Sequence, residues 1–115
     1  MQHGWVRQSE RPLWEPLIDV VGLDVVGAFM WMYEVELEDG EELHAYKSIA
    51  TRRYLHLALD GRAFAYVPRR RYRPVALLDA LEEVFDGWER LQPQPPKPEA
   101  VTALLARHRA QALAR

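Results

Sequence analysis

The chain contains no cysteine, which excludes disulfide bonds, thiolate nucleophiles and cysteine-ligated zinc. It also lacks a long apolar run. The longest, from Val25 to Tyr33, is nine residues and includes Gly27, whereas a membrane helix needs about 18. The amino-terminal residues 1–11 hold no apolar stretch of the signal-peptide kind. We therefore expect a cytoplasmic protein with no membrane partner.

Catalytic and phosphate-binding motifs are absent as well. Ser9 and Ser48 are the only serines, and neither lies in a GxSxG motif. The six glycines form neither GxGxxG nor the glycine-rich loop that ends in Gly-Lys-Ser or Gly-Lys-Thr. We therefore predict that the protein is not an enzyme and binds no cofactor.

The composition is that of a soluble globular domain, with 115 residues of which 49% are apolar and 28% charged. The net charge is −2, so the chain as a whole is not a polycation for phosphate. The charges are unevenly placed. Residues 34–42 carry six acids and no base, and residues 52–73 carry seven arginines and a single acid, Asp60.

Alternation of apolar and polar residues predicts four strands in the middle of the chain. The first begins at Phe29 and places glutamates on its wet face as far as Glu38. The Asp-Gly turns at 39–40 and 60–61 are typical of hairpins. The other strands are expected at 43–49, 53–59 and 63–67. This pattern predicts a four-stranded antiparallel meander, and it leaves open whether the sheet closes into a barrel.

The remaining segments complete an α+β domain over residues 1–91. Residues 1–24 are expected to be irregular or short-helical. Pro74 suits the first turn of an amphipathic helix with an acidic outer face, which would cover one side of the sheet and extend toward Leu91, unless Gly87 ends it early. Residues 92–98 (QPQPPKP) predict a stiff proline-rich spacer, and residues 99–115 a second amphipathic helix that packs in cis or in trans.

The basic segment is the strongest candidate for a binding site. In a meander, the start of the third strand and the end of the fourth lie at the same sheet edge, so the arginines of both are expected to form one patch around Tyr72. This candidate patch for a partner or a phosphate consists of Arg52, Arg53, Arg69, Arg70, Arg71, Tyr72 and Arg73. Its arginines are expected to pair with carboxylates of the acidic strand and helix or of a partner, with phosphate as the alternative.

Two histidines and a row of glutamates are weaker candidates. If the turn after Ile49 centres on Ala50, His44 and His56 face each other on neighbouring strands, with Tyr46 and Tyr54 on the same face. That makes them weak candidates for a metal site, because no third ligand follows at a recognisable spacing. Glu34, Glu36 and Glu38 line one wet face, where ion pairing with arginines is a better explanation than catalysis.

Together these patterns predict a small non-enzymatic accessory or regulatory protein that acts through protein–protein contacts. Four tryptophans and a first strand that is apolar on both faces at its start favour a homodimer. An acidic protein partner is a further possibility. The alternative function is nucleic-acid binding through the arginine patch, and the third is an enzyme or metal site built on histidine and tyrosine.

Overall fold

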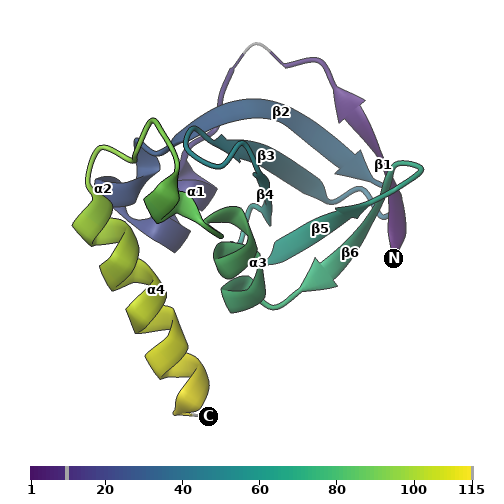
Figure 1. The fold of residues 1–115 in the computed structure, drawn as a ribbon. Coiled ribbons are helices and arrows are strands. Elements are labelled where there is room, and N and C mark those ends of the chain that lie inside the picture. The colour runs from purple at the N-terminus through teal and green to yellow at the C-terminus, as the bar shows by residue number, and fades with distance from the viewer. Residues whose placement is uncertain (10, 115) are drawn as a thin grey trace.

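The computed structural model describes residues 1–9 and 11–114 and shows a closed barrel of six antiparallel strands, in the order β1-β2-β3-β4-β5-β6, with helices on its outside (Figure 1). The strands are β1 (Gln2–Arg7), β2 (Phe29–Leu37), β3 (Glu42–Ser48), β4 (Tyr54–Ala58), β5 (Ala63–Val67) and β6 (Arg71–Val75). The helices are α1 (Glu15–Val21), α2 (Leu23–Val26), α3 (Leu77–Val84) and α4 (Pro98–Leu113), with a single 3-10 turn at Trp88–Arg90.

The predicted four-stranded meander is wrong, because two further strands close the sheet. The antiparallel order from β2 to β5 follows the expected sequence, but residues 2–7, expected to be irregular, form β1. The segment expected to cross over to a helix forms β6 and pairs with β5. Pro74 therefore lies in a strand opposite Phe64, and the helix starts three residues later. The overall class, mixed α and β with antiparallel strands, agrees with the prediction.

Strand β1 closes the barrel by pairing with both β2 and β6. Gly4 lies opposite Leu37 in this strand. A Cβ atom at Gly4 would lie 2.8 Å from a ring carbon of Tyr72 and 2.8 Å from a methyl group of Val35. Glycine is therefore required here so that the ring of Tyr72 can fill the barrel under β1.

The core has two parts, one on each face of the barrel wall. Inside the barrel, the luminal cluster contains the buried residues Val35, Leu37, Leu43, Ala58, Phe64 and Tyr72. Outside, the helices cover the opposite face of β3 and β4, where Tyr46, Leu55 and Leu57 are buried against them. Strands β3 and β4 are therefore buried on both faces, as expected for the centre of a two-layer structure.

The helices gather on one side of the barrel, and α4 runs along this group and projects beyond it (Figure 1). Helix α3 ends at Val84 rather than near Leu91, and Gly87 follows with a φ of 73°. The amino-terminal half of α4 packs in cis, since Val101, Leu104 and Leu105 are buried in the outer cluster. Arg109 also pairs with Glu82 of α3 at 3.1 Å. Arg115, the last residue of the predicted second helix, lies outside the described residues.

Among the described residues, no helix has both the length and the apolar character needed to cross a bilayer.

Candidate functional site

Five aromatic side chains meet at one end of the barrel, in a cluster that we call the tyrosine mouth: Tyr33, Tyr54, His56, Tyr66 and Tyr72. Ring centroids of neighbours lie 5.3 Å apart for His56 and Tyr72, 5.4 Å for Tyr66 and Tyr72, and 5.9 Å for Tyr54 and His56. These distances are typical of favourable aromatic contacts. The tyrosine mouth is therefore one connected surface of rings.

Strand register brings these residues together from four strands. Tyr33 lies opposite Ala45, and Ala45 lies opposite His56, so their side chains share the luminal face. Tyr66 lies directly opposite Tyr72 on the same face. Tyr54 precedes His56 by two residues, and so it also points inward. Tyr54 and Tyr66 reach the solvent with 37% and 51% of their surfaces exposed.

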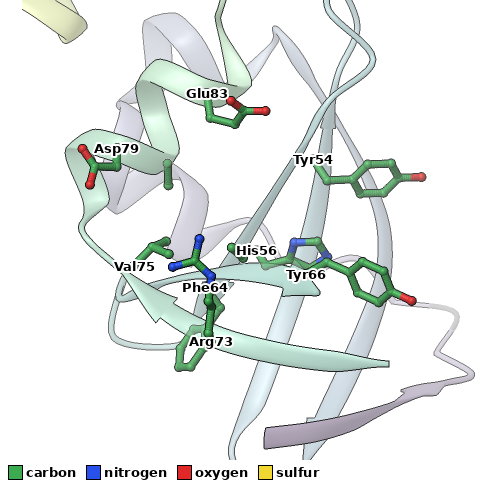
Figure 2. Close-up of a pocket in the computed structure, with 10 residues that line it drawn as sticks. Tyr54, His56, Phe64, Tyr66, Arg73, Val75, Asp79 and Glu83 are labelled. Carbon is green, nitrogen blue, oxygen red and sulfur yellow. The ribbon is translucent and has the colours of Figure 1, made fainter. Parts of the chain in front are cut away.

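The barrel wall is incomplete beside the tyrosine mouth. Strands β4 and β5 pair only through His56 with Phe64 and Leu57 with Ala63, whereas β5 and β6 stay paired as far as Val67 and Arg71. The two strands therefore diverge where Tyr54 and Tyr66 are attached. Figure 2 shows His56 between these two tyrosines, with α3 above them.

Two cavities adjoin the tyrosine mouth, and Tyr66 lines both. The first, the side cleft, has a volume of about 470 Å³ and lies between α3 and the diverging strands. It is lined by Tyr54, His56, Phe64, Tyr66, Arg73, Asp79 and Glu83, among others. The second, the mouth cavity, has a volume of about 500 Å³ and is lined by Gly4, Trp5, Val6, Tyr33, Tyr66, Arg70 and Tyr72. Both volumes are in the range of small-ligand sites.

His56 is the buried polar group of this region. Burial lowers its pKa from 6.5 to about 4, because desolvation disfavours the charged imidazolium. The imidazole is therefore neutral at pH 7. Its Nε2 atom is buried and has no hydrogen-bond partner among the described residues. A buried polar atom without a partner is destabilising, and in a native protein it calls for an explanation such as a bound ligand.

The hydroxyls of Tyr33 and Tyr72 stay protonated at neutral pH. Burial, with the neighbouring Tyr33 and Tyr66, raises the pKa of Tyr72 to about 12. Burial also raises the pKa of Tyr33, with a contribution from Tyr54 and Tyr66. These two rings therefore act as neutral stacking surfaces that can each donate one hydrogen bond, and they are poorly suited to act as bases or nucleophiles.

His44 lies on the opposite face from His56, so the expected face-to-face pair is wrong. The register places His44 opposite Leu57 and Ala45 opposite His56. Tyr46 likewise points outward, and its hydroxyl donates a hydrogen bond of 2.6 Å to the carbonyl oxygen of Leu13. A metal site shared by the two histidines cannot form in this register.

His44 nevertheless belongs to a polar cluster with Glu34 and Glu42, whose ligand atoms lie within 4.8 Å of one another. Trp31 Nε1 donates to His44 Nδ1 at 3.0 Å. Because an indole N–H can only donate, Nδ1 must accept, and the neutral imidazole carries its proton on Nε2. Nε2 then donates to Glu42 at 2.6 Å. This bonding leaves no lone pair on His44 for a metal ion.

The predicted arginine patch is divided in the structure. Arg53 binds α3, with ion pairs to Glu83 at 3.4 Å and to Asp86 at 3.3 Å. Arg52 lies in the β3–β4 turn with a φ of 66°. Figure 1 places this turn near the helices and the β5–β6 turn far from it, beside β1. The β3–β4 turn is therefore separated from the tip of the β5–β6 hairpin, whereas Arg53 pairs with Glu83, which lines the same cleft as Arg73.

The other four arginines of the patch lie on the β5–β6 hairpin, and we call them the hairpin arginines: Arg69, Arg70, Arg71 and Arg73. None of them has a carboxylate within 4.0 Å in the described part of the chain, whereas four of the eight other arginines there do. Arg70 lines the mouth cavity and Arg73 the side cleft. Tyr72, also in the predicted patch, is part of the tyrosine mouth.

The two residues at the tip of the hairpin have a strained backbone. Arg69 has a φ of 72° and Arg70 a φ of 59°, in the left-handed region that favours glycine or asparagine. Such strain costs on the order of 1–3 kcal/mol for each residue and is concentrated at functional sites. Arginine at both positions therefore favours a role for the charged side chains themselves.

The glutamate row is mostly engaged in ion pairs and hydrogen bonds. Glu34 pairs with Arg7 of β1 at 3.5 Å, and Glu38 contacts Nδ1 of His3 at 2.9 Å. Glu36 lies opposite both Trp5 and Glu42. The predicted pairing with arginines is therefore found for Glu34, while Glu38 contacts a histidine.

Sequence reasoning missed the tyrosine mouth as a site. Alternation places Tyr54 and His56 on one face, but it gives no reason to bring Tyr33 and Tyr66 to them, because their meeting depends on barrel closure. The comparisons with known proteins add no further guide, since no protein-family model, curated protein or solved structure matches the chain.

Proposed function

We propose that this protein is a non-enzymatic binding module for single-stranded nucleic acid. In this proposal the tyrosine mouth stacks bases and the hairpin arginines contact phosphates. Bases stack on aromatic rings with little dependence on sequence, and basic grooves follow the backbone. The observation that carries the proposal is the position of four arginines, without carboxylate partners among the described residues, on the hairpin that supplies Tyr66 and Tyr72.

The negative net charge does not count strongly against this function. Many carboxylates are engaged in ion pairs. Arg62 pairs with Glu41 and with Asp60, Arg53 with Glu83 and Asp86, and Arg109 with Glu82. The field of such a pair falls off faster than that of a free charge, and salt screens it beyond roughly 8–10 Å. The local charge at the hairpin is therefore more relevant to binding than the sum over the chain.

Fluorescence anisotropy with a labelled single-stranded oligonucleotide tests the proposal at about 50 mM and about 200 mM salt. The test variant combines Arg69→Asn and Arg70→Asn, because asparagine tolerates the left-handed backbone. The expected result is weaker binding and a fall of about 1.4 in the logarithmic salt slope, since each lost phosphate contact on a single strand removes about 0.7.

Arg62→Asn is the control. It removes one positive charge next to the Asp60-Gly61 turn, where Arg62 already pairs with two carboxylates, so binding is expected to change little. Absence of salt-dependent binding by the unchanged protein at the lower salt concentration would rule out the proposal.

The second candidate is a protein–protein interface at the same surface, with a homodimer or an acidic partner. Trp5 is 51% exposed and Val6 62% exposed, and both line the mouth cavity beside Arg70. Aromatic residues and arginine are enriched in the cores of protein interfaces. Sedimentation of the full chain tests self-association, with Trp5→Ala and Val6→Ala expected to shift a dimer toward monomer. A full chain that sediments as a monomer at all concentrations contradicts the homodimer.

A further inference from the structure

Strand β1 covers only part of one edge of β2. It pairs with β2 from Glu34 to Leu37, whereas β3 pairs with the other edge of β2 from Phe29 onward. In Figure 1 the chain turns away from β2 as it leaves β1. Among the described residues, no strand therefore lies beside residues 29–33 on this side. This open edge presents backbone N–H and C=O groups, which a fully closed barrel wall pairs.

A cavity, which we call the edge slot, lies at this open edge. It has a volume of about 570 Å³, and its lining includes Val6, Arg7, Trp31, Met32 and Tyr33. The register of β2 against β3 shifts between Trp31 and Tyr33, so Met32 forms a β-bulge. As a result Trp31 packs against the outer cluster and Tyr33 against the luminal cluster. Side chains from both faces of β2 line the same cavity because the edge between them is uncovered.

The edge slot continues the mouth cavity. Val6 and Tyr33 line both cavities, and Tyr33 is itself part of the tyrosine mouth. Val6 is 62% exposed, so the surface that joins the two cavities is open to a ligand. Each cavity also has an arginine in its lining, Arg70 in the mouth cavity and Arg7 in the edge slot. The two cavities therefore form one path along β1 and β2.

Charge favours the edge slot over the side cleft as the continuation of the tyrosine mouth. Asp79 and Glu83 line the side cleft, whereas the described residues that line the edge slot include Arg7 and no acid. Arg7 pairs through Nε with Glu34 at 3.5 Å, and half of its side chain is exposed, so its guanidinium keeps further N–H donors for a phosphate. A negatively charged strand that leaves the tyrosine mouth therefore meets less repulsion in the edge slot.

We infer that the edge slot is a second subsite for single-stranded nucleic acid, and that the bound strand runs from the tyrosine mouth over Val6 into this slot. In the bound state Arg7 contacts a phosphate, and Met32 and Tyr33 provide apolar contact for a base. The open edge of residues 29–33 offers backbone donors and acceptors to the polar edge of that base. This inference rests on the proposed function and assigns it a longer ligand, a strand that fills both cavities rather than a single nucleotide.

An extended peptide is the other ligand that an open strand edge accepts, because it can add a strand to the sheet. The arginine in each cavity favours nucleic acid, since a peptide backbone has no charge that Arg7 and Arg70 would neutralise. A nucleic-acid strand places a phosphate at every nucleotide, and it therefore matches a path with one arginine in each cavity.

The test introduces a charge at Met32 in the full chain. Met32 lines the edge slot but belongs to neither core cluster of the described residues, so its replacement is expected to leave the barrel intact. Fluorescence anisotropy uses a labelled oligothymidine of about ten nucleotides, within the roughly 4–16 that small barrels binding single strands cover. At about 50 mM salt, Met32→Lys is expected to bind about tenfold more tightly than Met32→Glu. Met32→Lys is also expected to steepen the logarithmic salt slope by about 0.7.

Leu59→Lys and Leu59→Glu are the matched controls. Leu59 is 53% exposed and lines a cavity at the β2–β3 and β4–β5 turns, beyond the other end of β2 from residues 29–33. The same exchange of charge at this place, which lies off the path, is expected to change binding by less than about twofold. Thermal unfolding at pH 7 checks that all four variants are folded.

The outcomes separate this inference from the proposed function. If the oligothymidine binds through the hairpin arginines but the two Met32 variants differ no more than the two Leu59 variants, the edge slot is not a subsite and the proposed function stands. If no oligonucleotide binds at the lower salt concentration, both are wrong. A labelled oligoglutamate peptide is the competing probe. If it binds with the dependence on Met32 and the oligothymidine does not bind, the slot is a peptide site, and both are again wrong.

Discussion

His44 and His56 lie on neighbouring strands, and both are buried, with 1% and 3% of their surfaces exposed. His44, on the outer face, accepts a hydrogen bond from Trp31 and donates one to Glu42. His56, on the luminal face, has a buried Nε2 without a partner among the described residues. The difference indicates two roles for the same residue type. His44 is a structural link in the wall, whereas His56 has a hydrogen-bonding capacity that the fold itself does not use.

The sharpest way to test this comparison is the same substitution at both sites. His44→Phe leaves the indole N–H of Trp31 and the carboxylate of Glu42 without partners. It is expected to lower the free energy of unfolding by about 3–4 kcal/mol, because one of the lost bonds involves a charged group. His56→Phe at pH 7 removes an unpartnered atom, and the expected change is within about 1 kcal/mol. Urea unfolding at pH 7 measures both, and equal losses would contradict the distinction.

A second test uses pH. Because the pKa of His56 is about 4 in the folded protein and about 6.5 when unfolded, the unfolded chain binds more protons between these values. The contribution of neutral His56 to the free energy of unfolding is complete above pH 6.5. About 3 kcal/mol of this free energy is lost as the pH falls to 4. Burial lowers the pKa of His108 as well, which adds a loss in the same direction.

The contribution of His56 is therefore isolated by comparing the unchanged protein with His56→Phe in urea unfolding across this pH range. The variant keeps the pH-dependent loss of stability that comes from His108. Below pH 6.5 it is therefore expected to lose less stability than the unchanged protein. If the two proteins lose stability in parallel, His56 is not held neutral by the fold.

The smallest expected effect concerns the bond that sets the tautomer of His44. Trp31→Phe removes the donor to Nδ1, and a loss of about 1 kcal/mol in the free energy of unfolding is expected. The ¹⁵N shifts of His44 are expected to change from a single tautomer, protonated at Nε2, to a mixture. Trp5→Phe is the control, because Trp5 is half exposed and lies on β1, two strands away from His44 on β3. An unchanged tautomer in Trp31→Phe means that Glu42 alone determines the proton position.

Part of the barrel was predictable because β2 alternates apolar and polar residues from Tyr33 onward and β4 places its leucines on one face. The expected strand at 63–67 coincides with β5, and the two Asp-Gly turns are the hairpin turns that connect β2 to β3 and β4 to β5. The two closing strands were not predictable from their own residues. Strand β6 contains two arginines and Pro74, and this local sequence predicts a turn followed by a helix. It becomes a strand because β5 and β1 satisfy its backbone on both sides.

The candidate site was also only partly predictable from the local sequence. Alternation placed Tyr54 and His56 on one face, but the relation between neighbouring strands depends on the turn between them. The turn from β3 to β4 is centred between Ala50 and Thr51, not on Ala50. A change of one residue in register moves a strand's side chains to the other face relative to its neighbour, so His44 and His56 point in opposite directions.

The sequence by itself determined the local features of this protein: the period-two strands, the Asp-Gly turns, the absence of cysteine, and the run of arginines between two prolines. The strands and turns depend on interactions between residues close together in the chain, and the other two features are properties of the composition. Only the tertiary structure decided the barrel closure, the division of the arginines between α3 and the hairpin, and the meeting of four tyrosine rings with His56. Those outcomes depend on register and on packing between distant segments. Moving the centre of the β3–β4 turn by half a residue decides which face the side chains of one strand share with those of the next.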